Sequence, residues 1–235
     1  MTGVSVGIGR AIAERLALDG YEIHGTYLTH ADQAQELATQ LPGLTLHRVD
    51  LVAPDGPQRL VDELPDGPWQ ALVNNAGIAL EEPLDHFDAA IWQRTLAINL
   101  LAPVALARAL ESRLVDGSVV NIASTDARIG SYSSAAYAAS KAALVSATRS
   151  LANVLARSRI RVNAVSPGWI DTQMTTLPEL AAEVAPLQRI GRPSEVADAV
   201  AWLVGPEATF VTGSDIVVDG GFGNAEPVLR REAGM

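Results

Sequence analysis

The sequence has 235 residues, 48% of them hydrophobic, which suffices for one α/β domain over residues 1–235 but is tight for two. A formal net charge of −10 and scattered arginines leave no basic face for a nucleic-acid backbone. Cysteine is absent and the four histidines lie far apart, so neither a disulfide nor a metal site is expected. We find no signal peptide and no uncharged apolar run long enough for a membrane span, and therefore expect a cytoplasmic protein.

The chain opens with a glycine-rich loop, MTGVSVGIG, that leads directly into a helical pattern. Such a loop normally joins a buried strand to a helix whose first backbone N–H groups bind a phosphate. No strand precedes the loop in this sequence. We therefore expect the first central strand of the sheet to be missing, because the sequence either starts inside a longer natural chain or is a shortened form.

Short runs rich in β-branched residues then alternate with longer helical patterns, which is typical of βαβ units. The predicted strands are residues 21–27, 44–49, 70–74, 117–123, 160–166 and 215–218. The predicted helices are residues 8–19, 30–41, 56–64, 88–114, 134–157, 176–185 and 194–204. The order predicts an α/β fold with a Rossmann-type doubly wound parallel sheet and helices on both faces, from which the first central strand is missing.

The helix predicted at residues 134–157 is apolar or small on nearly every side. A helix with one face in water should carry a polar stripe, so we expect this helix to be covered by the sheet and by another subunit. A homodimer or homotetramer through the 88–114 and 134–157 helices follows. An alanine-rich helix favoured only by its intrinsic propensity is the alternative.

Three residues of the second half suggest acid–base chemistry. Tyr137 and Lys141 lie four residues apart on one helix, and therefore on one face. Lys141 is the only lysine in the chain, which indicates a position where a compact ammonium is needed. An ammonium favours the phenolate and so lowers the pKa of a phenol, which is about 10 when free. Ser124 ends the strand VVNIAS, where the loops of open α/β sheets gather ligands. Each residue alone is also compatible with an ordinary structural role.

Together with the opening loop, these residues resemble the short-chain dehydrogenase/reductase family over nearly the whole chain. TGVSVGIG matches the family's TGxxxGxG loop, NNAG at residues 74–77 its turn, and Asn99 its helix asparagine. Ser124, Tyr137 and Lys141 then complete a catalytic tetrad in the family's order and spacing. Later matches are PGWIDT, RIGRPSEVA and VTGSDIVVDGG. Within this family the chain resembles β-ketoacyl-acyl-carrier-protein reductases and similar small ketoreductases.

The resemblance implies hydride transfer from a nicotinamide coenzyme to a ketone carbon. Tyr137 would give a proton to the ketone oxygen, and Ser124 would hold that oxygen. Lys141 would bind the nicotinamide ribose and lower the pKa of Tyr137. Asn99 would hold a water molecule that connects Lys141 to solvent.

The coenzyme contacts implied by the resemblance follow the family motifs residue by residue. They are Gly3, Ser5, Gly7, Ile8 and Gly9 at the pyrophosphate, Tyr27 at the ribose, Asp50 and Leu51 at the adenine, Asn75, Ala76 and Gly77 at the adenosine ribose, and Tyr137, Lys141, Pro167, Gly168, Ile170 and Thr172 at the nicotinamide. Asp50 is equally compatible with a simple helix cap.

The choice of dinucleotide depends on the end of the strand that carries Tyr27. NAD-preferring members of the family place an acid there for the ribose 2′-hydroxyl, so Tyr27 favours NADP(H) over NAD(H). Val6 and Leu28 stand where NADP-preferring members often carry Arg or Lys. Thr29 and His30 are the remaining candidates for the 2′-phosphate.

The substrate expected from the resemblance is a β-ketoacyl thioester of fatty acid biosynthesis. An acyl-carrier-bound substrate would be attracted by a basic patch near the cleft, for which the sequence offers Arg113, Arg157, Arg159 and Arg161. Ordinary surface ion pairs are the alternative role of these arginines. The apolar segment after Thr172 suits a hydrophobic substrate but selects none. A small alcohol, sugar or other free carbonyl compound therefore stays open, as does a truncated, non-catalytic coenzyme-binding or assembly protein.

Overall fold

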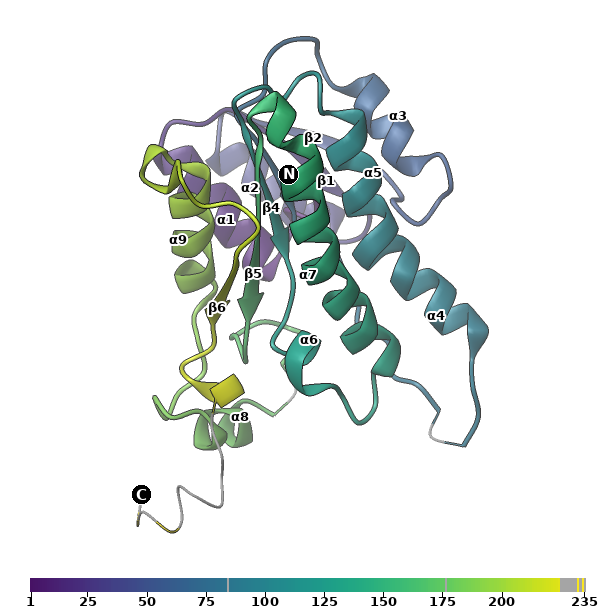
Figure 1. Ribbon diagram of the computed structural model, residues 1–235, viewed down its shortest axis with the longest axis vertical. Helices are drawn as coiled ribbons and strands as arrows, with labels where there is room; N and C mark the ends of the chain where they lie inside the picture. Colours follow the sequence, from purple (N-terminus) through teal and green to yellow (C-terminus); the bar gives the residue numbers. More distant parts are fainter. Residues whose placement is uncertain (84, 176, 225–231, 233, 235) are drawn as a thin grey trace.

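The computed structural model describes residues 1–83, 85–175, 177–224, 232 and 234, and within them every strand runs parallel to its neighbours. The strands are β1 (Ile23–Tyr27), β2 (Leu44–Arg48), β3 (Ala71–Asn74), β4 (Ser118–Ile122), β5 (Arg161–Pro167) and β6 (Asp215–Val218). β1 pairs with β2, and β3, β4, β5 and β6 pair in that order. Figure 1 shows the strands side by side in the middle of the molecule, so all the predicted strands are confirmed.

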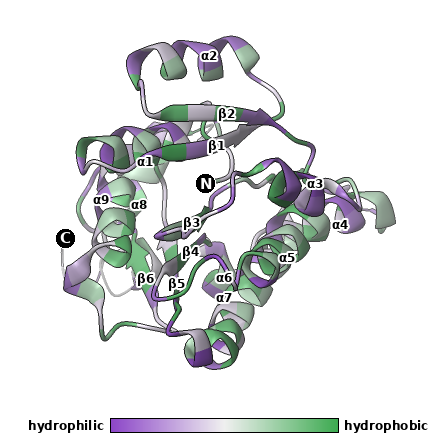
Figure 2. Cartoon of the chain, turned by 90° about the horizontal axis from the view of Figure 1, so that it is seen from above, coloured by the Kyte–Doolittle hydropathy of each residue, from purple (hydrophilic) through white to green (hydrophobic). Residues whose placement is uncertain are grey.

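Helices cover both faces of these strands. They are α1 (Gly7–Leu18), α2 (Ala31–Gln40), α3 (Gly56–Glu63), α4 (Ala89–Leu96), α5 (Ala102–Ala109), α6 (Asp126–Ile129), α7 (Ala135–Leu155), α8 (Pro178–Val184) and α9 (Pro193–Val204). Seen from above, α1 and α9 lie on one face and α3, α5 and α7 on the other (Figure 2). The predicted Rossmann-type doubly wound arrangement is therefore confirmed.

The sheet is divided between β1 and β3, where the described residues form no strand, in agreement with the prediction. Residues 1–4 lie in this position as a short extended segment. The N–H of Thr2 donates to the carbonyl of Val73, and the N–H of Val4 to the carbonyl of Thr26, each at 2.9 Å. The first residues thus supply the carboxyl half of the missing strand and join the two parts of the sheet.

Beyond the first residue this gap continues as an open groove. The Met1 amine donates to the carbonyl oxygen of His24 at 2.6 Å. Burial lowers the pKa of this amine from 8.0 to about 5. Residues 19–22 and 65–70 form the walls of the groove, which has a volume of about 550 Å³. The groove thus lies between the segments that lead into β1 and β3.

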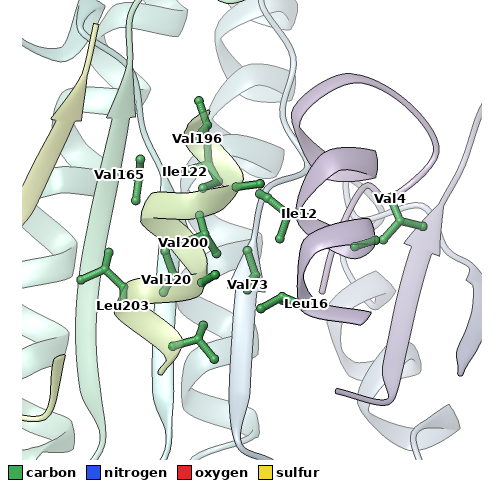
Figure 3. Packing of buried hydrophobic residues seen from close by; sticks show 14 of the residues in the cluster. Val4, Ile12, Leu16, Val73, Val120, Ile122, Val165, Val196, Val200 and Leu203 are labelled. Atoms are coloured by element: carbon green, nitrogen blue, oxygen red, sulfur yellow. The ribbon is translucent and has the colours of Figure 1, made fainter. Parts of the chain in front are cut away.

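Val4 anchors the short segment in the core. It is fully buried and belongs to the same cluster as Ile12 and Leu16 of α1 and Val200 of α9 (Figure 3). Gly25 of β1 leaves the space for it, because a Cβ there would lie 2.7 Å from a Val4 methyl carbon. We call residues 1–4, which connect the two parts of the sheet, the joint, and around Val4 this joint is well packed.

The helix predicted at residues 88–114 is interrupted and ends earlier than expected. A π-helical segment, Ala97–Leu101, separates α4 from α5, which ends at Ala109. Pro103 has no N–H to donate to the carbonyl of Asn99, four residues earlier, and this loss accounts for the change of hydrogen-bond pattern.

Within the described residues, one helical run, Ala89–Ala109, is long and apolar enough by length and composition to cross a membrane. The search for uncharged runs missed it because Arg94 and Arg108 lie within it. Only 28% of its most apolar window is buried. Leu106 packs in the core, whereas Leu101 is 60% exposed. One face of the run packs in the core, and the other exposes Leu101 together with polar residues such as Arg94 and Arg108.

Candidate active site

Three predicted catalytic residues converge at the carboxyl end of β4. Ser124 follows this strand and is 8% exposed, while Tyr137 and Lys141 project from the first two turns of α7. The Lys141 ammonium donates to the carbonyl of Ile122 at 2.7 Å and lies 5.6 Å from the centre of the Tyr137 ring. The end of the strand and the start of the helix thus bring a hydroxyl, a phenol and an ammonium into one site.

Burial controls the protonation of this site. It raises the pKa of Tyr137 to about 12, a hydrogen-bonding interaction with Ser124 acts in the opposite direction, and the charge of Asp126 adds to the increase. Burial also lowers the pKa of Lys141 from 10.5 to about 8. In the protein alone the pKa of Tyr137 therefore lies above that of a free phenol, because burial disfavours the phenolate, and the expected lowering by Lys141 stays a prediction.

Asn99 ties the loop after β3 to α7. Its Oδ1 accepts from the N–H of Ile78 at 2.9 Å, and its Nδ2 donates to the Ile78 carbonyl at 2.9 Å and to Ser140 Oγ at 3.0 Å. A Cβ on Gly77 would lie 3.0 Å from Asn99 Oδ1 and 3.3 Å from Lys141 Nζ, so glycine allows these groups to approach. The side-chain amide of Asn99 is therefore fully occupied by contacts within the protein. If Asn99 holds the predicted water molecule, its backbone carbonyl is the group that binds it.

The glycine loop is held against the turn that follows β3. Thr2 is 3% exposed, and its hydroxyl accepts from the N–H groups of Asn75 and Ala76, both at 3.0 Å. The Asn75 side chain donates to the carbonyl of Gly3 at 2.8 Å. A Cβ on Gly9 would lie 1.8 Å from the Gly3 carbonyl oxygen, so only glycine lets α1 begin this close to the loop.

The N-terminus of α1 fits the pyrophosphate of a dinucleotide. Gly7 begins the helix at φ +57°, and the capping residue Val6 offers no side-chain acceptor, so the first N–H groups are free for an anion. A Cβ on Gly7 would lie 3.3 Å from the Thr172 methyl, which places the predicted nicotinamide segment beside the loop. Other predicted contacts in the loop and at the end of β5 are Ser5, Ile8, Pro167, Gly168 and Ile170.

The predicted adenosine contacts lie at the carboxyl ends of β1 and β2. Tyr27 ends β1 and pairs in register with Arg48 of β2. Asp50 is exposed, and its carboxylate accepts from the N–H of Val52 at 2.9 Å within a turn, whereas the N-cap residue of α3 is Asp55, so the alternative of a helix cap is not observed. Leu51 is 6% exposed. This turn bond occupies only one carboxylate oxygen, so Asp50 can still contact an adenine.

The sequence analysis missed two acidic residues at the site. The N–H of Asp126 donates to Ser124 Oγ at 3.1 Å, and burial raises the pKa of the Asp126 carboxyl group. Glu82 contacts the first turn of α7. The position of Asp126, two residues after Ser124, could have revealed it, whereas Glu82 belongs to no motif that we matched.

The arginines predicted to form a basic patch near the cleft lie at the other edge of the sheet. Arg161 begins β5, and Arg157 and Arg159 follow the far end of α7. Arg157 pairs with Glu111 and Arg159 with Asp116. Arg113 donates to backbone carbonyls and to an acid as well. The expected basic patch near the cleft is therefore wrong. The arginines instead make local ion pairs and bonds to backbone carbonyls, which agrees with the alternative role.

Comparison with known proteins agrees with this geometry. A family model described as Enoyl-(Acyl carrier protein) reductase matches residues 3–223. The solved structure of a short-chain dehydrogenase/reductase from Serratia marcescens BCRC 10948 superposes with a TM-score of 0.88 at 30% identity, covering 94% of this chain and 96% of that one. The chain belongs to the short-chain dehydrogenase/reductase family. It is an NAD(P)-dependent oxidoreductase that acts on CH–OH and C=O groups.

Two further members of the family bear on coenzyme and substrate. The structure of BdcA in complex with NADPH has a TM-score of 0.89 and 35% identity, covering 96% of this chain and 93% of that one. The 3-oxoacyl-[acyl-carrier-protein] reductase FabG of Vibrio cholerae serotype O1 is 34% identical over 235 residues, which are 94% of this chain and 95% of the relative.

Proposed function

We propose that this short-chain dehydrogenase/reductase reduces a ketone with NADPH, with Tyr137 as the proton donor. The convergence of Ser124, Tyr137 and Lys141 at the end of β4, beside the glycine loop, carries the proposal. The coenzyme, when bound, supplies a hydride at the nicotinamide C4. A phenol with a pKa of about 12 is fully protonated at neutral pH, which suits donation to a ketone oxygen.

The neighbouring residues orient and replenish that proton. Ser124 Oγ, next to the phenol, can hold the ketone oxygen in line with it. Lys141, with a pKa of about 8, is mostly cationic at pH 7 and stabilises the phenolate left after transfer. The Asn99 carbonyl, which receives no N–H from Pro103, is available to hold the water that returns a proton.

Arg48 supports the choice of NADPH. It is exposed on β2, directly beside Tyr27, and its guanidinium group makes no hydrogen bond or ion pair within the described residues. Neighbouring strands lie about 4.8 Å apart, so a long guanidinium side chain on β2 can reach a phosphate at the end of β1. We expect Arg48→Ala to raise the KM for NADPH at least about tenfold and to leave the KM for NADH unchanged. Arg59→Ala, at an exposed position of α3, is the control; an equal effect on both coenzymes would reject the assignment.

We propose a β-ketoacyl thioester as the substrate class. The FabG relative supports it, and the segment between β5 and α9 exposes Met174, Leu177, Leu180 and Leu187, which suit an acyl chain. A free ketone or small alcohol is the second candidate, because the arginines expected to attract an acyl carrier lie away from the site.

A panel of carbonyl compounds tests both substrate classes. NADPH oxidation would be measured with β-ketoacyl thioesters of several chain lengths and with simple ketones. A higher kcat/KM for thioesters supports the first candidate, and a higher value for free ketones the second. A folded, NADPH-binding sample that turns over none of them would refute the proposed function.

We also propose that the chain forms a homo-oligomer through α4, α5 and α7 and works in the cytoplasm. Leu101 and Val154, 60% and 45% exposed, lie on the helices concerned, and only 28% of the most apolar window of the run Ala89–Ala109 is buried. Light scattering during size-exclusion chromatography tests this. Leu101→Glu should produce monomers, and a monomeric unsubstituted chain would exclude the interface.

A further inference from the structure

Glu82 connects three separate segments at the start of α7. Its Oε1 accepts from the N–H of Ala136 at 2.5 Å, and its Oε2 accepts from Trp92 Nε1 of α4 at 2.8 Å. Its own N–H donates to the carbonyl of Ser133 at 2.8 Å. A single partly buried side chain therefore binds the loop after β3, α4 and the first turn of α7 together.

This contact replaces a missing local cap. The first N–H groups of a helix have no partner within the helix and are normally satisfied by the side chain of the N-cap residue. In α7 the N-cap residue is Ser134, whose side chain makes no capping bond. Glu82, distant in sequence, accepts from Ala136 instead, and its negative charge suits the positive end of the helix.

The residue capped in this way directly precedes the proposed proton donor. Ala136 is followed by Tyr137, whose carbonyl accepts from Ser140 Oγ at 2.7 Å. Ser140 is in turn bound to Asn99. The first turn of α7 is thus fixed from Glu82 on the N-terminal side of Tyr137 and from Asn99 on the C-terminal side.

We propose that Glu82 is a positioning residue for the reaction: it fixes the first turn of α7 so that the Tyr137 phenol meets the substrate oxygen next to Ser124. The inference rests on the proposed role of Tyr137. Reacting groups must be held close to the productive geometry, and a displacement of about 1 Å can cost about 100-fold in rate. Among the described residues Glu82 makes no contact with the glycine loop or the end of β1, so we expect its effect on kcat to exceed its effect on coenzyme binding.

Four variants test the proposal. Glu82→Ala removes both acceptors and should lower kcat about tenfold or more, with the KM for NADPH within about twofold. Glu82→Gln keeps an oxygen that accepts from the Ala136 N–H, but its NH₂ group then faces the Trp92 N–H, so two donors oppose each other. We therefore expect kcat to fall, but by less than in Glu82→Ala. Adding Trp92→Phe to Glu82→Gln removes the opposing donor and should restore most of kcat. Glu81→Ala, at the exposed neighbouring position, should match the unsubstituted enzyme.

Thermal melts and Tyr137→Phe complete the experiment. Recovery of kcat in the double variant, at a melting temperature equal to that of Glu82→Gln, separates positioning from general stabilisation. A Glu82→Ala enzyme with unchanged kcat, or a double variant without recovery, overturns the inference. If Tyr137→Phe remains fully active, the proposed function itself fails, whatever the Glu82 variants do.

Discussion

The part of the sheet that carries the proposed chemistry and the part that begins with the glycine loop are built differently. β3, β4, β5 and β6 form a continuous parallel ladder, and Ser124, Tyr137 and Lys141 stand at the end of one of these strands and on the helix packed against it. β1 and β2 join this ladder through the short segment of residues 1–4. The proposed phosphate-binding loop is thus part of a joint, whereas the proposed catalytic groups lie on a continuous set of strands. Changes at the catalytic groups should act on kcat, and changes at the joint on stability and coenzyme binding.

The largest effect is expected at the catalytic end. General acid catalysis typically contributes about 10²–10⁴ in rate, so Tyr137→Phe should lower kcat by that factor while the Kd for NADPH, from fluorescence titration, changes little. Tyr132→Phe, at a fully exposed tyrosine, is the control. If Tyr137→Phe weakens NADPH binding by as large a factor as it lowers kcat, the catalytic end and the joint do not act separately.

The joint should respond in the opposite way. Thr2→Val keeps the side-chain shape but leaves the N–H groups of Asn75 and Ala76 without an acceptor, and each unsatisfied buried group costs about 1–3 kcal/mol. We expect a loss of about 2 kcal/mol or more in the free energy of unfolding. The KM for NADPH should rise severalfold with kcat nearly unchanged. Thr45→Val, on the exposed side of β2, should do neither. A fall in kcat without a change in KM would contradict the comparison.

Filling the groove should strengthen the joint. Five β-branched residues placed before Met1 can pair with β1 and β3, and each additional kcal/mol should raise Tm by about 2–4 °C in a domain of this size. A Gly/Ser extension of equal length is the control, since it adds backbone without apolar side chains. Equal melting temperatures for the two extended chains would show that the groove does not accept a strand.

The two extensions should also change how the stability of the chain depends on pH. The Met1 amine has a pKa of about 5 in the folded chain against 8.0 as an ordinary amine, so the folded state opposes its protonation. The folded state consequently loses stability as pH falls from 8 to 5, by up to about 1.4 kcal/mol per pH unit. Either extension converts the amine to an amide and removes this dependence. The difference in Tm between the original chain and both extended chains should therefore increase as the pH is lowered from 8 to 5. If this difference in Tm stays constant over that range, the amine is not buried.

The smallest effect is expected for Asp126→Asn. The charge of Asp126 raises the pKa of Tyr137, so its removal should lower that pKa. In alcohol oxidation, which requires the phenolate, the rising limb of the pH–rate profile should move to lower pH by less than about one unit. Asp85→Asn, at an exposed position, should leave the limb in place. A shift to higher pH would show that the carboxylate does not act on the phenol.

The strands and most helix bounds could be predicted from local pattern, because β-branched runs, helical periodicity and the matched motifs all act over short sequence distances. The proposed catalytic residues Ser124, Tyr137 and Lys141 lie close together, as their order in the matched motifs implies. The pKa of Tyr137 could not be predicted, because it depends on how completely the surrounding fold excludes water. The roles of Arg157 and Arg159 depend on distant acids such as Glu111, and the bond from Ala136 to Glu82 spans two segments far apart in the chain. Contacts of this kind leave no periodic signal in one sequence.

The two primary amines of the protein share one property: both are shielded from solvent. Lys141, the only lysine, is 4% exposed, and the amine of Met1 is buried against the carbonyl of His24. Acylating reagents and amine cross-linkers should therefore leave the folded chain nearly untouched. The rate at which such a reagent labels each position would report how often that part of the molecule opens, with Met1 marking the joint and Lys141 the catalytic centre.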